Sequence, residues 1–252
     1  MARTAVLGRL SPIRWQLGEV VELIDETPRV KTILLDAPDW AGHRAGQHVD
    51  VRLTAEDGYV AERSYSIASA PEDGHLAITV ERLDDGEVSP YLAEELVVGD
   101  KVEFRGPIGG YFVWEAREGG PLLLVGGGSG VVPLRAMLRH RAAVGADTPA
   151  RLLYSSRSLG DVIYRDELDM LDSADPYLEV RYALTRAQPE GWSGYSRRID
   201  EEILRETAYP NAEGVAFVCG PTRFVETVAD GLLAVGYSPE RVKTERFGPT
   251  GG

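Results

Sequence analysis

An apolar run that ends in glycines, at residues 122–138, constrains the fold of this chain more than any other stretch. It reads LLLVGGGSGVVPLRAML. Four consecutive apolar residues are typical of a parallel strand that is covered on both faces. The spacing of Leu134, Met137 and Leu138 is typical of a helix. Pro133 stands in the first turn of that helix, where its missing N–H costs nothing. The segment therefore predicts a strand, a tight turn and a helix.

The glycines of this turn fit a bound phosphate. Gly126, Gly127, Gly128 and Gly130 lack the Cβ atoms that would keep a pyrophosphate away from the backbone N–H groups, at the positive end of the helix dipole. The spacing is not the Gly-x-Gly-x-x-Gly of simple dehydrogenases, because Val131 or Pro133 stands where a third glycine would be needed. A tight turn without a ligand is the alternative interpretation of this stretch.

Length and charge bound the class of protein. A chain of 252 residues, 43% of them hydrophobic, is long enough for two domains of ordinary size. We expect it to be cytoplasmic and not inserted in a membrane, because no apolar stretch approaches the ~18 residues of a membrane span and no signal peptide is evident. The net charge of −13 argues against binding to nucleic acid, which needs a basic surface.

Cysteine and histidine usage limits the possible redox and metal sites. The single cysteine, Cys219, rules out an internal disulfide and the four thiolates of an iron–sulfur cluster, so a cluster would have to belong to a partner. The four histidines show no spacing typical of metal ligands. We therefore expect no metal site.

The two halves of the chain differ in periodicity. Apolar and polar side chains alternate from about residue 15 to residue 112, as in QHVDVRL at 47–53, and turn signals separate short strands. This pattern predicts an antiparallel β-barrel over residues 1–112. A short helix is expected at 90–96, with Ser89 as its N-cap.

Apolar strands alternate with helical patterns in the second half. The strands are LLLV, ARLLYSS, LEVRYAL, GVAFVC and RVKTERF, and the helix TRFVETVADGLLAVG ends at Gly236, a residue suited to a left-handed helix stop. This alternation predicts an α/β domain with a doubly wound parallel sheet over residues 113–252. Its ligand should lie at the carboxyl ends of the strands.

A second group of candidate ligand-binding residues lies in the barrel half. Arg63, Tyr65 and Ser66 offer a guanidinium, an aromatic ring and a hydroxyl, which together suit a flat, phosphorylated cofactor. An ordinary strand with an exposed arginine is the alternative. Gly86 and Ser89 stand before the expected short helix, another place where a phosphate meets backbone and hydroxyl donors. Two phosphate sites in two domains indicate two nucleotides.

Five motifs, in the order in which they stand here, resemble those of the ferredoxin–NADP reductase superfamily, and the resemblance runs from about residue 15 to the C-terminus. They are Arg63-x-Tyr65-Ser66 for the flavin, Gly86-x-x-Ser89 for the flavin pyrophosphate, Gly106-Pro107-x-Gly109 for the joint between domains, Gly127-Gly128-x-Gly130-x-x-Pro133 for the nicotinamide pyrophosphate, and Cys219-Gly220-Pro221 for the nicotinamide-side turn.

The resemblance implies an FAD-binding barrel followed by an NADP-binding domain. It places Arg63 on the FAD phosphates, Tyr65 against the isoalloxazine and Ser66 near the ring nitrogen that accepts hydride. The other positions that it assigns to FAD are Val80, Gly86, Val88, Ser89 and Phe247. Phe247 would cover the flavin face that the nicotinamide must reach, so that its displacement gates the reaction.

The resemblance also implies the residues around the nicotinamide. Ser66, Cys219 and Glu245 are the expected catalytic residues, with Cys219 beside the nicotinamide and not acting as a nucleophile. A small buried hydrophobe is the alternative role for Cys219. The positions assigned to the nicotinamide cofactor are Gly127, Gly128, Gly130, Cys219, Gly220 and Pro221.

The residues after the second parallel strand favour NADPH over NADH. Ser155, Ser156 and Arg157 stand where a carboxylate would be expected for the ribose hydroxyls of NADH. Arg157 can pair with a 2′-phosphate, and Arg186, after the third strand, can close the other side. Arg165 is a lesser candidate, because neighbouring acids make an ion pair at a helix end its expected role.

The expected function is that of an FAD-dependent NADPH reductase that passes electrons to a separate protein, a ferredoxin or an oxygenase component. A reductase of free flavin or another small acceptor, and a nonenzymatic nucleotide-sensing subunit, are the alternatives. An acidic chain would meet an acidic ferredoxin through a local basic patch. The candidates for that patch are Arg9, Arg14, Arg29 and Lys31.

Overall fold

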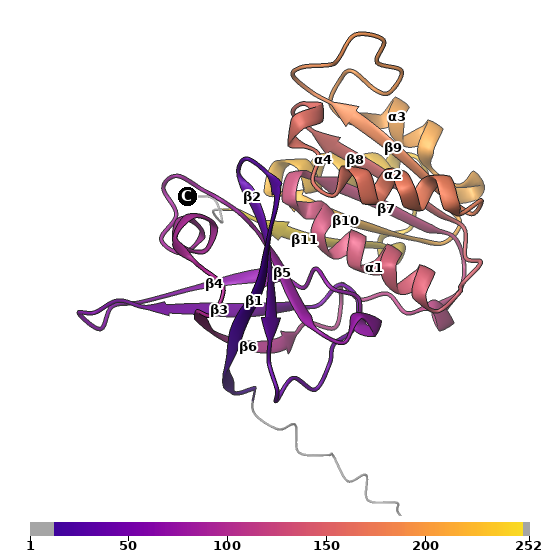
Figure 1. Ribbon diagram of the computed structural model, residues 1–252. Coiled ribbons are helices and arrows are strands. Elements are labelled where there is room, and N and C mark those ends of the chain that lie inside the picture. The colour runs from indigo at the N-terminus through magenta and orange to yellow at the C-terminus, as the bar shows by residue number, and fades with distance from the viewer. Residues whose placement is uncertain (1–12, 249–252) are drawn as a thin grey trace, which may run out of the picture.

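The computed structural model describes residues 13–248, and its N-terminal half is an antiparallel barrel (Figure 1). Its strands are β1 (Trp15–Thr27), β2 (Val30–Asp36), β3 (His48–Thr54), β4 (Val60–Ser66), β5 (Leu76–Glu81) and β6 (Lys101–Ile108). They pair in the order β4-β3-β6-β1-β2-β5. An antiparallel bridge between Ile67 and Ile78 joins the two outer strands, so the sheet closes on itself. The predicted antiparallel barrel is confirmed.

Alternation along the strands fills the barrel. Val49 and Val51 are fully buried on β3, and they meet Ile33, Ile78 and Phe104 from other strands in one hydrophobic core. The polar residues between them on β3 point away from this core, as expected when successive side chains face opposite sides of a strand. Every second side chain along these strands therefore fills the barrel interior.

The second half is a five-stranded parallel sheet with helices on both faces (Figure 1). The strands are β7 (Leu122–Gly127), β8 (Ala150–Ser156), β9 (Leu178–Leu184), β10 (Val215–Pro221) and β11 (Val242–Phe247), and the helices are α1 (Val131–Ala143), α2 (Arg165–Ala174), α3 (Glu201–Thr207) and α4 (Thr222–Ala234). Short 3-10 segments are η1 (Pro71–Asp73), η3 (Ala116–Glu118), η4 (Gly128–Gly130), η5 (Leu159–Asp161), η6 (Pro210–Ala212) and η7 (Pro239–Arg241). The predicted doubly wound α/β domain is confirmed.

The strand order β11-β10-β7-β8-β9 places a topological switch point between β7 and β10. From β7 the chain builds outward through β8 and β9, and it then returns to the other side for β10 and β11. Helices α1 and α2 pack on one face of the sheet, and α3 and α4 pack on the other. Open α/β sheets bind ligands at such a point, beyond the carboxyl ends of the strands.

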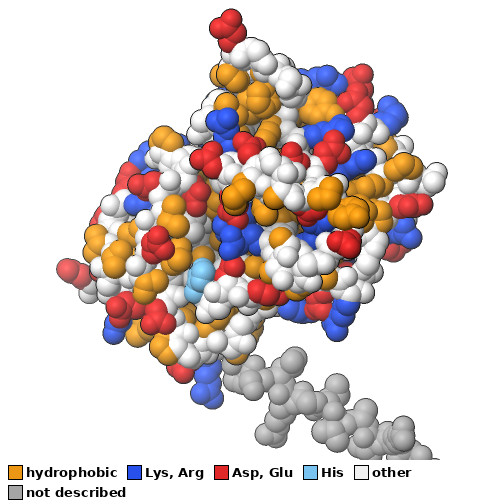
Figure 2. Space-filling view, turned by 45° about the vertical axis from the view of Figure 1, so that its right-hand side comes forward, with side chains coloured by type: hydrophobic (Ala, Val, Ile, Leu, Met, Phe, Trp, Pro, Cys, Tyr) orange, Lys and Arg blue, Asp and Glu red, His pale blue; other side chains and the backbone are white. Residues whose placement is uncertain are grey.

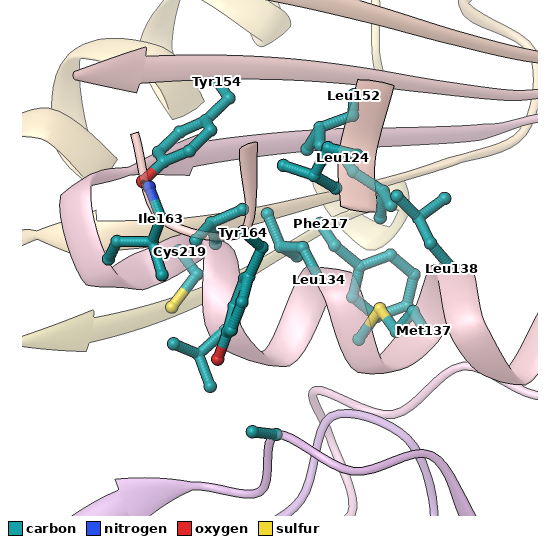
Figure 3. Packing of buried hydrophobic residues seen from close by; sticks show 14 of the residues in the cluster. Leu124, Leu134, Met137, Leu138, Leu152, Tyr154, Ile163, Tyr164, Phe217 and Cys219 are labelled. Carbon is teal, nitrogen blue, oxygen red and sulfur yellow. Dashed lines mark hydrogen bonds between the residues drawn. The ribbon is translucent and has the colours of Figure 1, made fainter. Parts of the chain in front are cut away.

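The predicted helix after the glycine turn is α1, and its apolar side chains face the sheet. Leu134, Met137 and Leu138 are fully buried with Leu124 and Phe217 in one core (Figure 3). The last predicted helix is α4, and Gly236, just beyond it, has φ +106, the left-handed stop that the sequence indicates.

The expected helix at 90–96 is a single π turn, η2 (Tyr91–Glu95), and the N-cap prediction for Ser89 is wrong. The Ser89 hydroxyl instead accepts a hydrogen bond from the backbone N–H of Leu83, at 3.1 Å. This bond closes the loop that contains Gly86, so Ser89 holds the loop and does not cap the turn. Among residues 13–248, no helix is both long enough and apolar enough to cross a bilayer.

Polar contacts join the two domains. Arg135 on α1 donates to the carbonyl of Ala68 in the barrel half at 2.9 Å. Arg139, one turn later, pairs with Asp73 at 2.7 Å, and both arginines also pair with Glu167 on α2. Helices α1 and α2 are therefore tied to each other and to the barrel.

Candidate functional site

A cleft of about 510 Å³ lies where the parallel sheet meets the barrel. The carboxyl ends of β7, β8, β10 and β11 line it, together with the turn between β1 and β2. It therefore occupies the position at which the strand order predicts a ligand. The residues from the sequence-based site that line it are Gly127, Gly128, Ser155, Ser156, Arg157, Pro221 and Phe247.

The glycine turn at the end of β7 packs too closely for side chains. A Cβ on Gly127 would lie 2.9 Å from the Phe224 ring, and a Cβ on Gly130 would lie 2.1 Å from the carbonyl oxygen of Cys219. Gly128 has φ +56, and nothing lies nearer than 3.9 Å to the place of its missing Cβ. The atom at that distance is a carboxylate oxygen of Glu81. Backbone without Cβ atoms at the start of α1 fits a pyrophosphate group.

Ser155, Ser156 and Arg157 stand at the end of β8, as expected, but two acids flank the arginine. Its guanidinium lies 3.7 Å from the carboxylate of Glu81 and 3.9 Å from that of Asp161. The strand end itself carries no acid, but the fold brings these two carboxylates to its arginine. Glu81 comes from the barrel strand β5, which is far away in the sequence.

Arg186 does not line the cleft in the part of the chain that the structure describes. Its backbone N–H donates to the carbonyl of Arg157 at 2.8 Å, so it supports the loop of that residue. Arg165 lies at the start of α2 and pairs with Asp169 at 3.7 Å. It forms an ion pair at a helix end, as expected, although its partner is one turn further along than the acids beside it.

Arg29, Arg198, Arg223 and Phe224 are among the cleft residues that sequence reasoning missed. Arg223 and Phe224 lie in the first turn of α4, one residue after the Cys219-Gly220-Pro221 turn, so their place next to a predicted ligand turn was a usable signal. A Cβ on Gly220 would lie 2.6 Å from the Phe224 ring. Arg29 and Arg198 come from loops and had no local signal.

Ser66, Cys219 and Glu245 come together where the two domains meet. Cys219 on β10 and Glu245 on β11 are paired in register. Burial raises the pKa of Glu245 to about 7, and the nearby Ser66 hydroxyl at the end of β4 partly offsets this shift. The structure thus places a carboxyl group that titrates near neutral pH beside a hydroxyl group of the other domain.

Cys219 is 1% exposed. Burial raises the pKa of its thiol, and the nearby Glu245 carboxylate raises it further. A thiol in such surroundings stays protonated and is a poor nucleophile. Cys219 belongs to the buried hydrophobic core of the parallel sheet, and its role beside the nicotinamide stays a prediction.

The residues expected to hold FAD lie on one side of the barrel. Arg63, in the middle of β4, has a half-exposed side chain that pairs with Glu87. A Cβ on Gly86 would lie 2.8 Å from the Ser89 hydroxyl, so this loop also packs too closely for a side chain. A guanidinium beside a compact glycine loop, with the Ser66 hydroxyl at the domain junction, fits a phosphorylated ring cofactor.

Three other residues expected at FAD are built into the barrel. Val80 and Val88 are 0% exposed, so their side chains belong to the barrel core and only their backbone atoms are left to face a ligand. Tyr65 packs against the same core, and burial raises the pKa of its phenol. Phe247 ends β11 opposite Pro221 and lines the cleft.

Acids lie beside two of the four residues expected in the basic patch, whereas Arg14 is exposed. Arg29 pairs with Asp84 at 3.1 Å, and Lys31 lies 3.7 Å from Asp25. Arg9 lies outside the described residues. Acidic and basic side chains are interspersed over the face that Figure 2 shows.

Comparison with known proteins identifies both halves. The model of the oxidoreductase FAD-binding domain matches residues 17–113, and that of the oxidoreductase NAD-binding domain matches residues 124–230. The glycine betaine monooxygenase reductase subunit of Chromohalobacter salexigens is 32% identical over 235 residues, which are 91% of this chain and 63% of the relative. The ferredoxin–NAD(P)(+) reductase component of the naphthalene 1,2-dioxygenase/salicylate 5-hydroxylase systems of Ralstonia sp. is 28% identical, over 95% of this chain and 71% of the relative.

Solved structures share the fold. The Amycolatopsis cytochrome P450 reductase GcoB superposes with a TM-score of 0.84 and 26% identity, over 98% of this chain and 74% of that one. A ferredoxin NADP+ reductase from Neisseria gonorrhoeae with bound FAD and NADP has a TM-score of 0.79 and 21% identity, over 92% and 98% of the two chains. The chain spans less than two thirds of the length of the glycine betaine monooxygenase reductase subunits. With an FAD-binding barrel followed by an NAD-binding parallel sheet, the chain belongs to the ferredoxin–NADP reductase superfamily.

Proposed function

We propose that this protein is an FAD-dependent NADPH oxidoreductase that passes electrons to a separate protein, a ferredoxin or an oxygenase component. The observation that carries the proposal is the meeting of Ser66 from the barrel with Cys219 and Glu245 from the parallel sheet. Each domain thereby brings its own polar group to the junction. The relatives described above are named as reductase components of oxygenase systems, and this supports a ferredoxin or an oxygenase component as the electron acceptor.

FAD would lie on the barrel domain, residues 1–112. Arg63 would release its ion pair with Glu87 and pair with the FAD phosphates instead. The Gly86 loop would let the pyrophosphate approach the backbone. Tyr65 and Ser66 would contact the isoalloxazine. Ser89 would act by holding the loop, and Val80 and Val88 would contribute backbone atoms, because their side chains are buried.

The nicotinamide cofactor would lie in the cleft of the second domain, residues 113–252. The turn at Gly127, Gly128 and Gly130 would hold its pyrophosphate, and Cys219-Gly220-Pro221 would lie beside the nicotinamide. Phe247 would stand between this turn and the flavin. FAD, when bound, supplies hydride acceptance from nicotinamide C4 and release of single electrons.

The protein itself would orient the two rings and exclude water. Positioning reactants in a near-attack geometry is worth several kcal/mol of a reaction barrier. The Glu245 carboxyl group, with its pKa raised to about 7, is suited to hold a proton and exchange it with the Ser66 oxygen.

NADPH is the proposed donor because Arg157 can pair with a 2′-phosphate while Ser155 and Ser156 donate hydrogen bonds. Arg198 and Arg223, which also line the cleft, add positive charge. NADH is the competing donor, and one observation favours it. Asp161 and Glu81 lie beside Arg157 and offer carboxylates to ribose hydroxyls.

Anaerobic titration of the purified, FAD-loaded protein tests the proposal. NADPH should remove the visible flavin absorbance at a lower concentration than NADH, and reoxidation should be fast with a ferredoxin and slow with free flavin. A protein that does not retain FAD, or whose flavin neither nucleotide reduces, would overturn the proposed function. Reduction by NADH alone would overturn only the choice of NADPH.

A further inference from the structure

The carboxylate of Glu81 lies in the cleft of the other domain. Glu81 ends β5 of the barrel, and its Oε2 accepts a hydrogen bond from the Ser129 hydroxyl at 2.8 Å. Its Oε1 lies 3.7 Å from the guanidinium of Arg157. Ser129 belongs to the glycine turn η4, so a negative side chain sits against the turn that is proposed to hold a pyrophosphate.

The barrel holds Glu81 in this place. Its neighbour Val80 is fully buried in the barrel core, and β5 is paired with β2 up to the Glu81 backbone opposite Val30. The Glu81 side chain is only 26% exposed. Its two contacts in the other domain therefore belong to a defined contact between domains and not to a freely moving surface side chain.

A carboxylate and a nucleotide phosphate repel each other at this turn. Repulsion between like charges is stronger in a partly enclosed cleft than in bulk water. A dinucleotide bound as proposed must take over Ser129 as a donor, and a 2′-phosphate must also take over Arg157. Glu81 holds both groups before the nucleotide arrives, so the nucleotide has to displace it.

We propose that Glu81 is a specificity-determining residue: it weakens nucleotide binding, and it weakens binding of the form with a 2′-phosphate most. The inference rests on the proposed binding of a pyridine nucleotide in this cleft. Glu81 thereby limits the preference for NADPH that Arg157 would otherwise confer. Binding of the nucleotide would also exchange a contact between domains, Ser129 with Glu81, for a contact with the ligand.

Calorimetric titration of the FAD-loaded protein with two nucleotide fragments tests this inference without turnover. The fragments are 2′,5′-ADP and 5′-ADP, which differ in the 2′-phosphate alone. Glu81→Gln removes the charge and keeps the size of the side chain. We expect the Kd of 2′,5′-ADP to fall at least about fivefold in Glu81→Gln. The Kd of 5′-ADP should fall by less, because this fragment carries fewer negative charges for the Glu81 carboxylate to repel.

Glu103→Gln is the matched control. Glu103 pairs with Arg52 on the barrel, and its side chain is 29% exposed, close to the value for Glu81. This variant should bind both fragments like the wild type. Glu81→Ala should shift the two Kd values in the same direction as Glu81→Gln, which guards against a folding defect in one variant. The inference is overturned if both Glu81 variants bind 2′,5′-ADP no more tightly than the wild type. It is also overturned if neither the wild type nor any variant binds the fragment detectably.

A double-mutant cycle with Arg157→Ala separates the two contacts of Glu81. If Glu81 acts on the 2′-phosphate through Arg157, the extra gain for 2′,5′-ADP over 5′-ADP should vanish in the Arg157→Ala background. A gain that persists would overturn this part. If NADPH reduces the flavin and Glu81→Gln does not change fragment binding, the inference about Glu81 is overturned and the proposed function stands. If neither nucleotide reduces the flavin, the proposed function itself is overturned.

Discussion

The Tyr164 hydroxyl and the Thr79 hydroxyl share a hydrogen bond across the boundary between the two domains. Tyr164 precedes α2 with φ +60, and left-handed backbone at a residue other than glycine is uncommon. The Arg135 guanidinium lies 4.4 Å from the centre of its ring. Figure 3 shows the ring of Tyr164 beside the buried core of the parallel sheet, with its hydroxyl directed toward the barrel. The unusual backbone thus aims this side chain at the other domain.

Tyr164→Phe should lower the free energy of unfolding by about 1 kcal/mol, the usual net value of one hydrogen bond. The loss stays small because Thr79 keeps its other hydrogen bond, to Thr32 at 2.8 Å. Chemical denaturation of the FAD-loaded protein measures the change. A double-mutant cycle with Thr79→Val should show coupling, since both variants remove the same bond.

Tyr182→Phe is the control for this cycle. The Tyr182 hydroxyl donates to Asp169 at 2.7 Å within the α/β domain. The losses of unfolding free energy caused by Tyr182→Phe and by Thr79→Val should add to within about 0.5 kcal/mol in the double variant, because the two sites share no partner. Simple additivity of Tyr164→Phe and Thr79→Val would contradict a direct bond between the domains.

The pH dependence of stability should depend on Glu245. Its pKa lies at about 7 in the folded protein against an ordinary value of 4.5, because burial disfavours the charged form. Between these two values the unfolded chain has lost a proton that the folded chain still holds. The free energy of unfolding should therefore fall as pH rises through this window, by up to about 3 kcal/mol.

Glu245→Gln should abolish this part of the pH dependence, because glutamine does not titrate. The variant should be no more stable than the wild type near pH 4.5 and more stable near pH 7.5. Denaturation curves at both pH values measure the difference. Parallel stability profiles of the two proteins would show that Glu245 keeps an ordinary pKa.

Local pattern was sufficient to predict most of the fold. The apolar run at 122–125 became β7 because a parallel strand that is covered on both faces needs apolar side chains on both of them. The alternation of apolar and polar residues at 48–54 became β3, because successive side chains of a barrel strand face the core and the outside in turn. The short helix expected at 90–96 is the π turn Tyr91–Glu95, and the Ser89 hydroxyl accepts a hydrogen bond from Leu83 instead of capping that turn.

The site was predictable where its residues follow one another in the chain and not where they come from the other domain. Ser155, Ser156 and Arg157 end a strand that periodicity identifies, so their place in the cleft follows from the fold. Glu81 and Arg29 reach the same cleft from the barrel, and only the packing of the two domains brings them there. Local sequence carries no information on that packing.

Arg157→Ala should reduce the preference for NADPH over NADH. One charge-assisted contact is worth about 1.5 to 3 kcal/mol, or about tenfold to 150-fold in the ratio of kcat/KM values. Steady-state kinetics with both nucleotides measure this ratio. Arg165→Ala is the control, because Arg165 pairs with Asp169 on α2 and does not line the cleft. An unchanged ratio in Arg157→Ala would exclude this residue as the partner of a 2′-phosphate.

Gly130→Ala should be destabilising by about 1 to 3 kcal/mol, the usual cost of forcing extra volume into a packed site. The new Cβ would lie 2.1 Å from the Cys219 carbonyl oxygen, and backbone on both sides leaves it no flexible neighbour to displace. Gly160→Ala is the matched control, since the nearest atom to its Cβ is the Ser158 hydroxyl oxygen at 4.0 Å. Thermal unfolding should separate the two variants. Because any shift of Gly130 also moves η4 against β10, Gly130→Ala should weaken 5′-ADP binding, and Gly160→Ala should not. Equal stability of the two variants would contradict the close packing of the glycine turn against Cys219.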